Sequence, residues 1–115
     1  MINVEQEQLE KLTTEYQLLQ EQLQSQALQR EQYKMQKEEY KEALAELEKA
    51  SGKIYKALGG IMVEVSKEEA KKDIEEKQSL LDMRLEIVGK QYTDLAKKEQ
   101  EMRSQINALL KDLKQ

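Results

Sequence analysis

Apolar residues follow a heptad pattern along the first fifty residues of the chain. From Ile2, alternating steps of three and four reach a series of mostly apolar positions without a break. This spacing is typical of the a and d positions of a coiled coil. The middle of the series is polar, because Gln26, Arg30 and Lys37 occupy heptad positions there. The pattern predicts a long helix over 1–50 whose packing stripe is weakest in its middle.

A second heptad pattern runs from Lys71 to Leu113 with few polar interruptions. It predicts another helix of similar length, over 67–114. Two equal helices joined by a short connector fold back most simply on each other, so we expect an antiparallel two-helix coiled coil. Pairing a with d positions across it places Leu23 level with Leu95, to within one heptad.

Short motifs mark the inner ends of the two helices. Gly52 suits the left-handed residue that follows the end of a helix. Ser66 and Glu69 have the spacing of a capping box, in which the Ser66 hydroxyl accepts a hydrogen bond from the Glu69 amide. We therefore expect the first helix to end near residue 50 and the second to begin directly after Ser66.

Residues 53–65 lose the helical period and gather β-branched and aromatic side chains on both sides of Gly59-Gly60. Paired glycines favour a hairpin turn, because glycine takes positive φ at little cost. The sequence predicts two short strands, with alternate residues from Ile61 onward sharing one face. An ordinary surface loop is the alternative.

Such a hairpin would lie at the closed end of the coiled coil with almost nothing to cover it. Isolated two-stranded hairpins are marginal in water, and free edges invite pairing with other chains. We therefore expect it to join the hairpins of other subunits in a shared sheet or barrel. A second apolar stripe on the adjacent helix extends this contact, with scattered surface exposure as the alternative. The residues expected at subunit contacts are Ile54, Tyr55, Leu58, Ile61, Met62, Val63, Val65, Leu80 and Ile87.

The opposite, open end of the coiled coil also carries an excess of apolar side chains. Terminal turns fray, and frayed apolar ends offer adaptable surface for weak binding of non-native chains. Simple closure of the seam is the alternative. The residues expected to bind such clients are Met1, Ile2, Val4, Leu9, Ile106, Leu109, Leu110 and Leu113.

Composition removes most enzyme classes. The 115 residues include no His and no Cys, which excludes histidine-based triads, dithiol chemistry and Cys/His zinc sites. The 37% of charged residues is also typical of disordered chains, but sustained heptads favour folded helices. Adjacent carboxylates such as Glu38-Glu39 diverge on a helix, so we expect solvated surface and no catalytic residue, cofactor or metal. A carboxylate cluster holding Mg²⁺ or Ca²⁺ is the open alternative.

Charge and hydropathy also narrow the partners. The net charge of −4 leaves no surface that neutralises phosphates, so we expect no nucleic acid. No basic amphipathic helix and no long apolar run is present, so we expect no membrane association. The N-terminal residues do not resemble a signal peptide, and a cytoplasmic protein is expected.

The connector between the two heptad helices resembles that of prefoldin β subunits of the archaeal type. The run Ile54-Tyr55-Lys56, followed by Gly59 and the run Ile61-Met62-Val63, carries the resemblance most specifically. The resemblance covers essentially the whole chain and implies a single prefoldin-like domain over 1–115. One hairpin fits the β type, since α-type subunits of that family carry two.

This resemblance implies an ATP-independent molecular chaperone. Two α and four β subunits would form a heterohexamer, joined through their hairpins into a double β-barrel with six coiled-coil tentacles. Unfolded client proteins would be held at the tentacle tips and passed to a group II chaperonin. A structural or scaffolding coiled coil that binds a specific folded partner is the alternative function.

Overall fold

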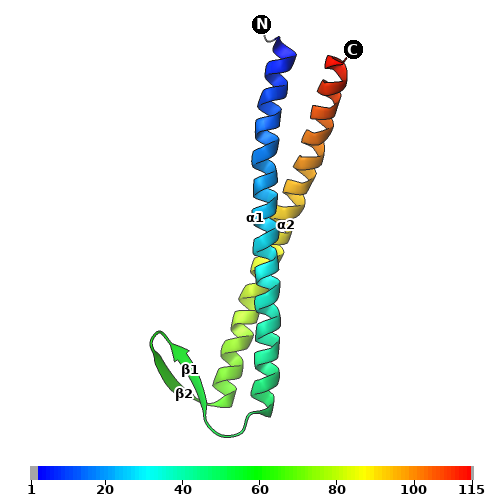
Figure 1. Cartoon of the computed structure of the whole chain (residues 1–115). Coiled ribbons are helices and arrows are strands. Elements are labelled where there is room, and N and C mark those ends of the chain that lie inside the picture. Colours follow the sequence, from blue (N-terminus) through cyan, green and yellow to red (C-terminus); the bar gives the residue numbers. More distant parts are fainter. Residues whose placement is uncertain (1–2, 115) are drawn as a thin grey trace. The chain divides into compact units, whose positions relative to one another are not determined.

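The computed structural model describes residues 3–114 of the chain, which form two long helices and one hairpin. The elements follow in the order α1 (Val4–Lys49), β1 (Ile54–Leu58), β2 (Ile61–Val65) and α2 (Lys67–Leu113) (Figure 1). The predicted mainly α fold, with a single β-hairpin between two long helices, is confirmed.

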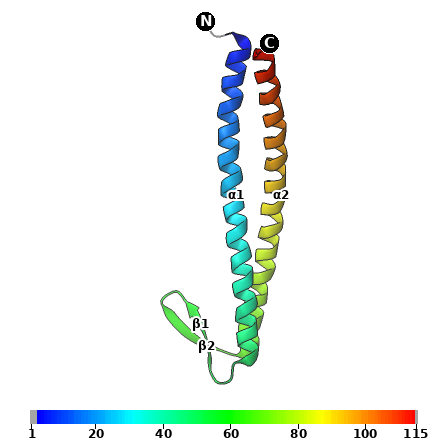
Figure 2. The ribbon, with the colours of Figure 1, turned by 45° about the vertical axis from the view of Figure 1, so that its right-hand side comes forward.

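The chain divides into two compact units, and each contains a part of both helices. The first unit comprises Met1–Arg30 and Ile87–Gln115, and the second comprises Glu31–Glu86 with the hairpin. Within each unit the α1 and α2 segments lie side by side and run antiparallel (Figures 1 and 2). Each unit therefore has its own portion of the seam between the helices.

The predicted heptad positions form the core of both units. Every described α1 residue that is buried or half-buried, from Leu9 to Leu47, occupies one of these positions. In α2 the predicted positions are covered in the same way, apart from exposed Lys71 near the helix start. The core side chains with the least exposure are Leu19, Leu81 and Val88.

Two polar contacts join the helices across the first unit's seam. The Tyr16 hydroxyl donates to Glu99 Oε1 over 2.6 Å, and Arg103 Nε lies 3.6 Å from the same oxygen. This hydrogen bond raises the pKa of Tyr16, because the phenolate form would lose it. The Arg30 guanidinium carbon lies 5.8 Å from the centre of the Tyr92 ring, a cation–π arrangement.

Ion pairs join the helices within the second unit. Lys37 Nζ lies 2.9 Å from Asp82 Oδ1, and Lys71 Nζ lies 3.7 Å from Glu48 Oε1. Lys67 Nζ also donates to the Glu48 carbonyl over 2.8 Å. These pairs agree with the expected register. Their side chains are largely exposed, so each ion pair stabilises the fold by only about 0–1 kcal/mol.

Helix caps lie where the sequence predicts them, and one is additional. The Glu69 amide donates to Ser66 Oγ over 3.1 Å, and Gly52 takes a φ of 94° after the end of α1. At the start of α1, Asn3 and Gln6 form a reciprocal capping box with distances of 3.1 and 2.8 Å. The sequence signal of this additional cap is the N-x-x-Q spacing of Asn3 and Gln6, which was not among the predicted caps.

The connector is a hairpin, as the paired glycines predict. β1 pairs antiparallel with β2, and Leu58 opposes Ile61, which leaves Gly59-Gly60 as a two-residue turn. Gly59 has a φ of 59°, whereas Gly60 has no positive φ. Positive φ at the first turn residue alone is typical of a type II′ turn, whose twist matches that of the strands.

Gly89 lies in the interior of α2, where glycine weakens a helix. A Cβ placed there would meet nothing within 4 Å, and its φ is not positive. We predict that Gly89→Ala raises the free energy of unfolding by about 0.5–1 kcal/mol, measured by urea unfolding. Gly59→Ala is the matched control, and it should lower the same quantity by roughly 1 kcal/mol because its φ is left-handed. Destabilisation by Gly89→Ala would contradict the prediction.

Candidate functional site

The two faces of the hairpin differ in exposure. The half-buried strand residues share one face, because Ile54 opposes Val65 and Lys56 opposes Val63 in the strand register. The same face continues to the turn, where its residues become exposed. The hairpin thus has a partly covered base and an open end.

Large apolar side chains on both faces of the hairpin are open to solvent. Ile61 is 64% exposed on the partly covered face, and Met62 is 66% exposed on the other. Tyr55 and Leu58 are about half exposed. The sheet has only two strands, so each strand also has one unpaired edge within the described chain. Apolar faces together with open edges are the features through which strands pair with other chains.

A hollow at the base of the hairpin adds to this surface. Ile54 and Tyr55 of β1 line it, together with Leu47 of α1 and Ile74 of α2. The hollow lies within the second unit and has a largely apolar lining. The sequence carries no signal for this hollow, because both helix residues are heptad positions and only the path of β1 leaves a space beside them.

One ion pair holds the hairpin against α2. Lys56 Nζ lies 3.0 Å from Asp73 Oδ1, and Lys77 Nζ lies 3.1 Å from Asp73 Oδ2. Hydrogen bonds from Lys56, and then from Lys77, lower the pKa of the Asp73 carboxyl, because both lysines favour its charged form. The sequence carries no signal for this contact beyond the presence of opposite charges.

The second apolar stripe of α2, formed by Leu80, Met83 and Ile87, is exposed in the single chain. Leu80 and Met83 belong to the second unit, and Ile87 is the first α2 residue of the other unit. All three side chains are open to solvent, so they are available for the subunit contact expected of Leu80 and Ile87.

The residues expected to bind clients separate into two groups. Val4 is 79% exposed and Leu110 is 40% exposed, so both offer apolar surface to solvent. Met1 and Ile2 lie outside the described residues. The remaining four are half-buried heptad positions that close the seam of the first unit, namely Leu9, Ile106, Leu109 and Leu113.

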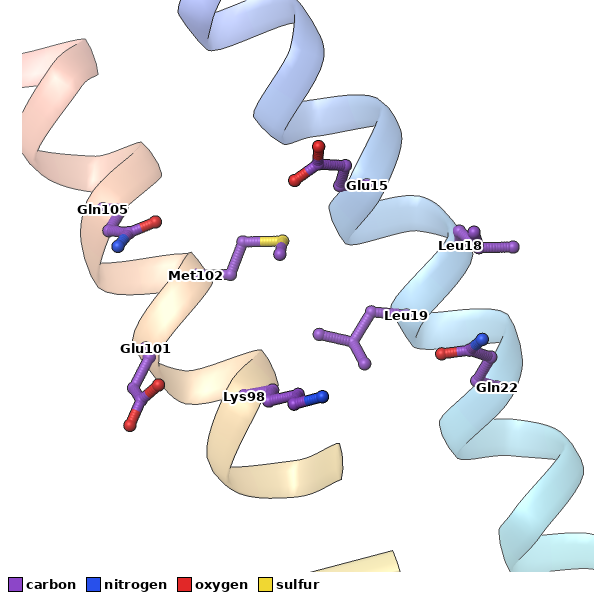
Figure 3. A pocket seen from close by; sticks show the side chains of 8 residues that line it. All are labelled: Glu15, Leu18, Leu19, Gln22, Lys98, Glu101, Met102 and Gln105. Carbon is purple, nitrogen blue, oxygen red and sulfur yellow. The ribbon is translucent and has the colours of Figure 1, made fainter. Parts of the chain in front are cut away.

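A groove in the first unit provides a further apolar surface. Leu19 of α1 and Met102 of α2 point toward each other across it, and Leu18 lies at its rim (Figure 3). Charged and amide side chains surround this apolar floor. Such a groove can take an apolar side chain of another polypeptide. The heptad pattern predicts Leu19 and Met102 only as seam positions, and Leu18 lies outside that pattern.

Metal-binding clusters and membrane-spanning helices are not found among the described residues. Residues 3–114 bring together no group of three or more acidic side chains that could hold a metal ion. No helix in this range has the length and apolar character needed to cross a bilayer.

Comparisons with known proteins agree with this architecture. The crystal structure of the prefoldin β subunit from Thermococcus strain KS-1 matches with a TM-score of 0.81 and 28% identity, covering 88% of this chain and 90% of that chain. The β2 subunit from the same strain shares the fold, with a TM-score of 0.70, 22% identity and coverage of 77% and 97%. No curated protein sequence matches the chain. The profile of the prefoldin subunit family matches residues 6–113, and the chain therefore belongs to the prefoldin family.

Proposed function

We propose that this chain is a β-type subunit of a cytoplasmic, hetero-oligomeric prefoldin chaperone. Membership of the prefoldin family supports the role of a chaperone subunit. The observation that carries the proposal is the uncovered hairpin, whose Ile61 and Met62 expose apolar surface on opposite faces. The alternative, a scaffolding coiled coil that binds a specific folded partner, should not suppress aggregation of unrelated denatured proteins. We assign the chain no enzymatic activity, no cofactor and no nucleic-acid or membrane partner.

The partner in assembly is a prefoldin α subunit, in a heterohexamer held together by its hairpins. The exposed strand residues would pack in a shared β-barrel, and the unpaired edges of β1 and β2 would pair with neighbouring strands. The hollow beside Ile54 and Tyr55 would receive side chains of a neighbour. Leu80 and Ile87 would extend the contact along α2. The whole chain would act as one prefoldin-like domain.

Clients would be non-native proteins, held at the free helix ends without ATP and then passed to a group II chaperonin. Exposed Val4 and Leu110 supply the apolar contact there. Each tip offers little area, so binding by one subunit is weak. Several tips acting together can raise the avidity by roughly 10²- to 10⁴-fold.

We predict that Ile61→Asp together with Met62→Asp abolishes assembly with a co-expressed prefoldin α subunit. Both side chains are exposed in the single chain, so the helices should keep their circular dichroism. Burying the two charges in a subunit contact costs several kcal/mol. Native mass spectrometry measures the result. The matched control is Leu28→Asp with Met35→Asp, which places the same charges on exposed apolar positions of α1 and should leave assembly intact. A hexamer formed by the hairpin variant would contradict the proposal.

We predict that removing apolar surface from the tips lowers client capture and spares assembly. In Val4→Ser with Leu110→Ser, the assembled complex should need several-fold more protein to suppress aggregation of unrelated denatured proteins without nucleotide, since avidity multiplies a small loss at each tip. Leu28→Ser removes exposed apolar surface away from the helix ends and is the control. If the complex that carries the tip variant protects clients fully, the clients bind elsewhere. The groove lined by Leu18 is then the next candidate.

A further inference from the structure

The hairpin is joined to α2 at two points. Ser66 is the only residue between the last residue of β2 and the first residue of α2. The second point is the contact of Lys56 with Asp73, 3.0 Å long. Toward α1, residues 50–53 form a longer link that includes the left-handed Gly52. A single-residue link fixes the position of a hairpin but leaves its orientation free, so the orientation depends on the Lys56 contact and on the half-buried side chains beside it.

The Lys56–Asp73 ion pair is less exposed than the ion pairs that join α1 to α2. The carboxylate of Asp73 uses both oxygens, one for Lys56 of β1 and the other for Lys77 of α2. The Lys56 and Asp73 side chains are 31% and 24% exposed, whereas both partners of the Lys37–Asp82 pair are 55% exposed. Solvent and salt therefore screen the first pair less.

No second polar contact shares this task in the part of the chain that is described. Among residues 3–114, the Lys56–Asp73 pair is the single side-chain hydrogen bond or ion pair that joins a strand to a helix. Lys56 lies on the partly covered face, opposite Val63. With Lys56 held on α2, Met62 on the other face of the hairpin stays open to solvent.

We propose that the Lys56–Asp73 pair is a positioning contact that holds the hairpin in the orientation that neighbouring subunits bind. This inference rests on the proposed function, because it concerns how the same hairpin meets its partners. Without the pair the hairpin samples more orientations, and only a fraction of the molecules is ready to assemble. The apparent dissociation constant rises by the inverse of that fraction. A pair with this exposure contributes little to the stability of the single chain.

The first test compares two variants that each remove one carboxylate charge. Asp73→Asn should weaken assembly with the α subunit by roughly three- to tenfold, since the competent fraction falls by that factor. Asp82→Asn breaks the exposed Lys37 pair and should leave assembly unchanged. Helicity and the urea midpoint should stay the same in both. Equal assembly by Asp73→Asn and the wild type would overturn the inference. Failure of the wild type itself to assemble would instead overturn the proposed function.

A double-mutant cycle then separates this contact from a general loss of charge. Lys56→Met keeps the aliphatic stem and should weaken assembly to the same extent as Asp73→Asn. If the two residues act through one contact, the double variant is no weaker than either single variant. Additive losses would overturn the inference. Faster amide exchange in β1 of the single-chain Asp73→Asn variant, with unchanged exchange in the helices, would support loss of orientation.

The pair also predicts a pH dependence. The charged groups that face Asp73 are Lys56 from β1 and Lys77 from α2, and both keep its pKa below the ordinary value. The ion pair that holds the hairpin in its orientation is therefore present at neutral pH. It is lost as the pH falls through this lowered pKa. NMR titration of the Asp73 carboxyl should show the low midpoint, and Lys56→Met should raise it. An ordinary midpoint in the wild type would show that the pair does not form, which would overturn the inference.

Discussion

The narrow apolar seam between α1 and α2 is the constraint on which the rest of the molecule depends. Only one or two side chains per helical turn leave solvent, and Leu19, Leu81 and Val88 are the described residues buried most completely. Each such side chain stabilises the fold by about 1.5–3 kcal/mol, while ordering of the backbone opposes it. The seam takes up most of the apolar residues of the helices, so few remain to cover the hairpin. The same composition therefore leaves the apolar side chains of the hairpin largely exposed in the single chain.

Polar groups within the seam give it a defined register. Leucines at neighbouring heptads are nearly interchangeable, whereas the Tyr16 hydroxyl reaches Glu99 in one register alone. A slip by one heptad would leave the Glu99 carboxylate without that hydrogen bond and expose its charge to an apolar environment. Gln26 shows the opposite case, because no protein group within residues 3–114 donates a hydrogen bond to its buried Oε1. The seam is therefore weakest where the polar interruptions of α1 begin.

Heptad spacing predicts the helices well because it is a local property of the sequence. It places the buried residues of α1 correctly, and it fails only for polar heptad positions such as Glu5 and Lys37, which remain exposed. The contact between Lys56 and Asp73 could not be predicted, because it depends on the direction in which the hairpin leaves Ser66. The apolar residues at the free helix ends could be predicted only in part. Apolar residues can be counted in the sequence, but only the fold separates exposed Val4 from the half-buried seam residues.

In the proposed function, assembly and client capture would use different units of the chain. The hairpin belongs to the second unit and the free helix ends belong to the first, and each unit has polar contacts of its own. Substitutions at independent sites usually act additively, so a change at the hairpin should leave the intrinsic affinity of a single tip unchanged. Client capture as proposed would nevertheless depend on assembly, because weak tips hold a chain only when several act together. Loss of the hairpin contact would thus remove avidity without altering any residue proposed to touch the client.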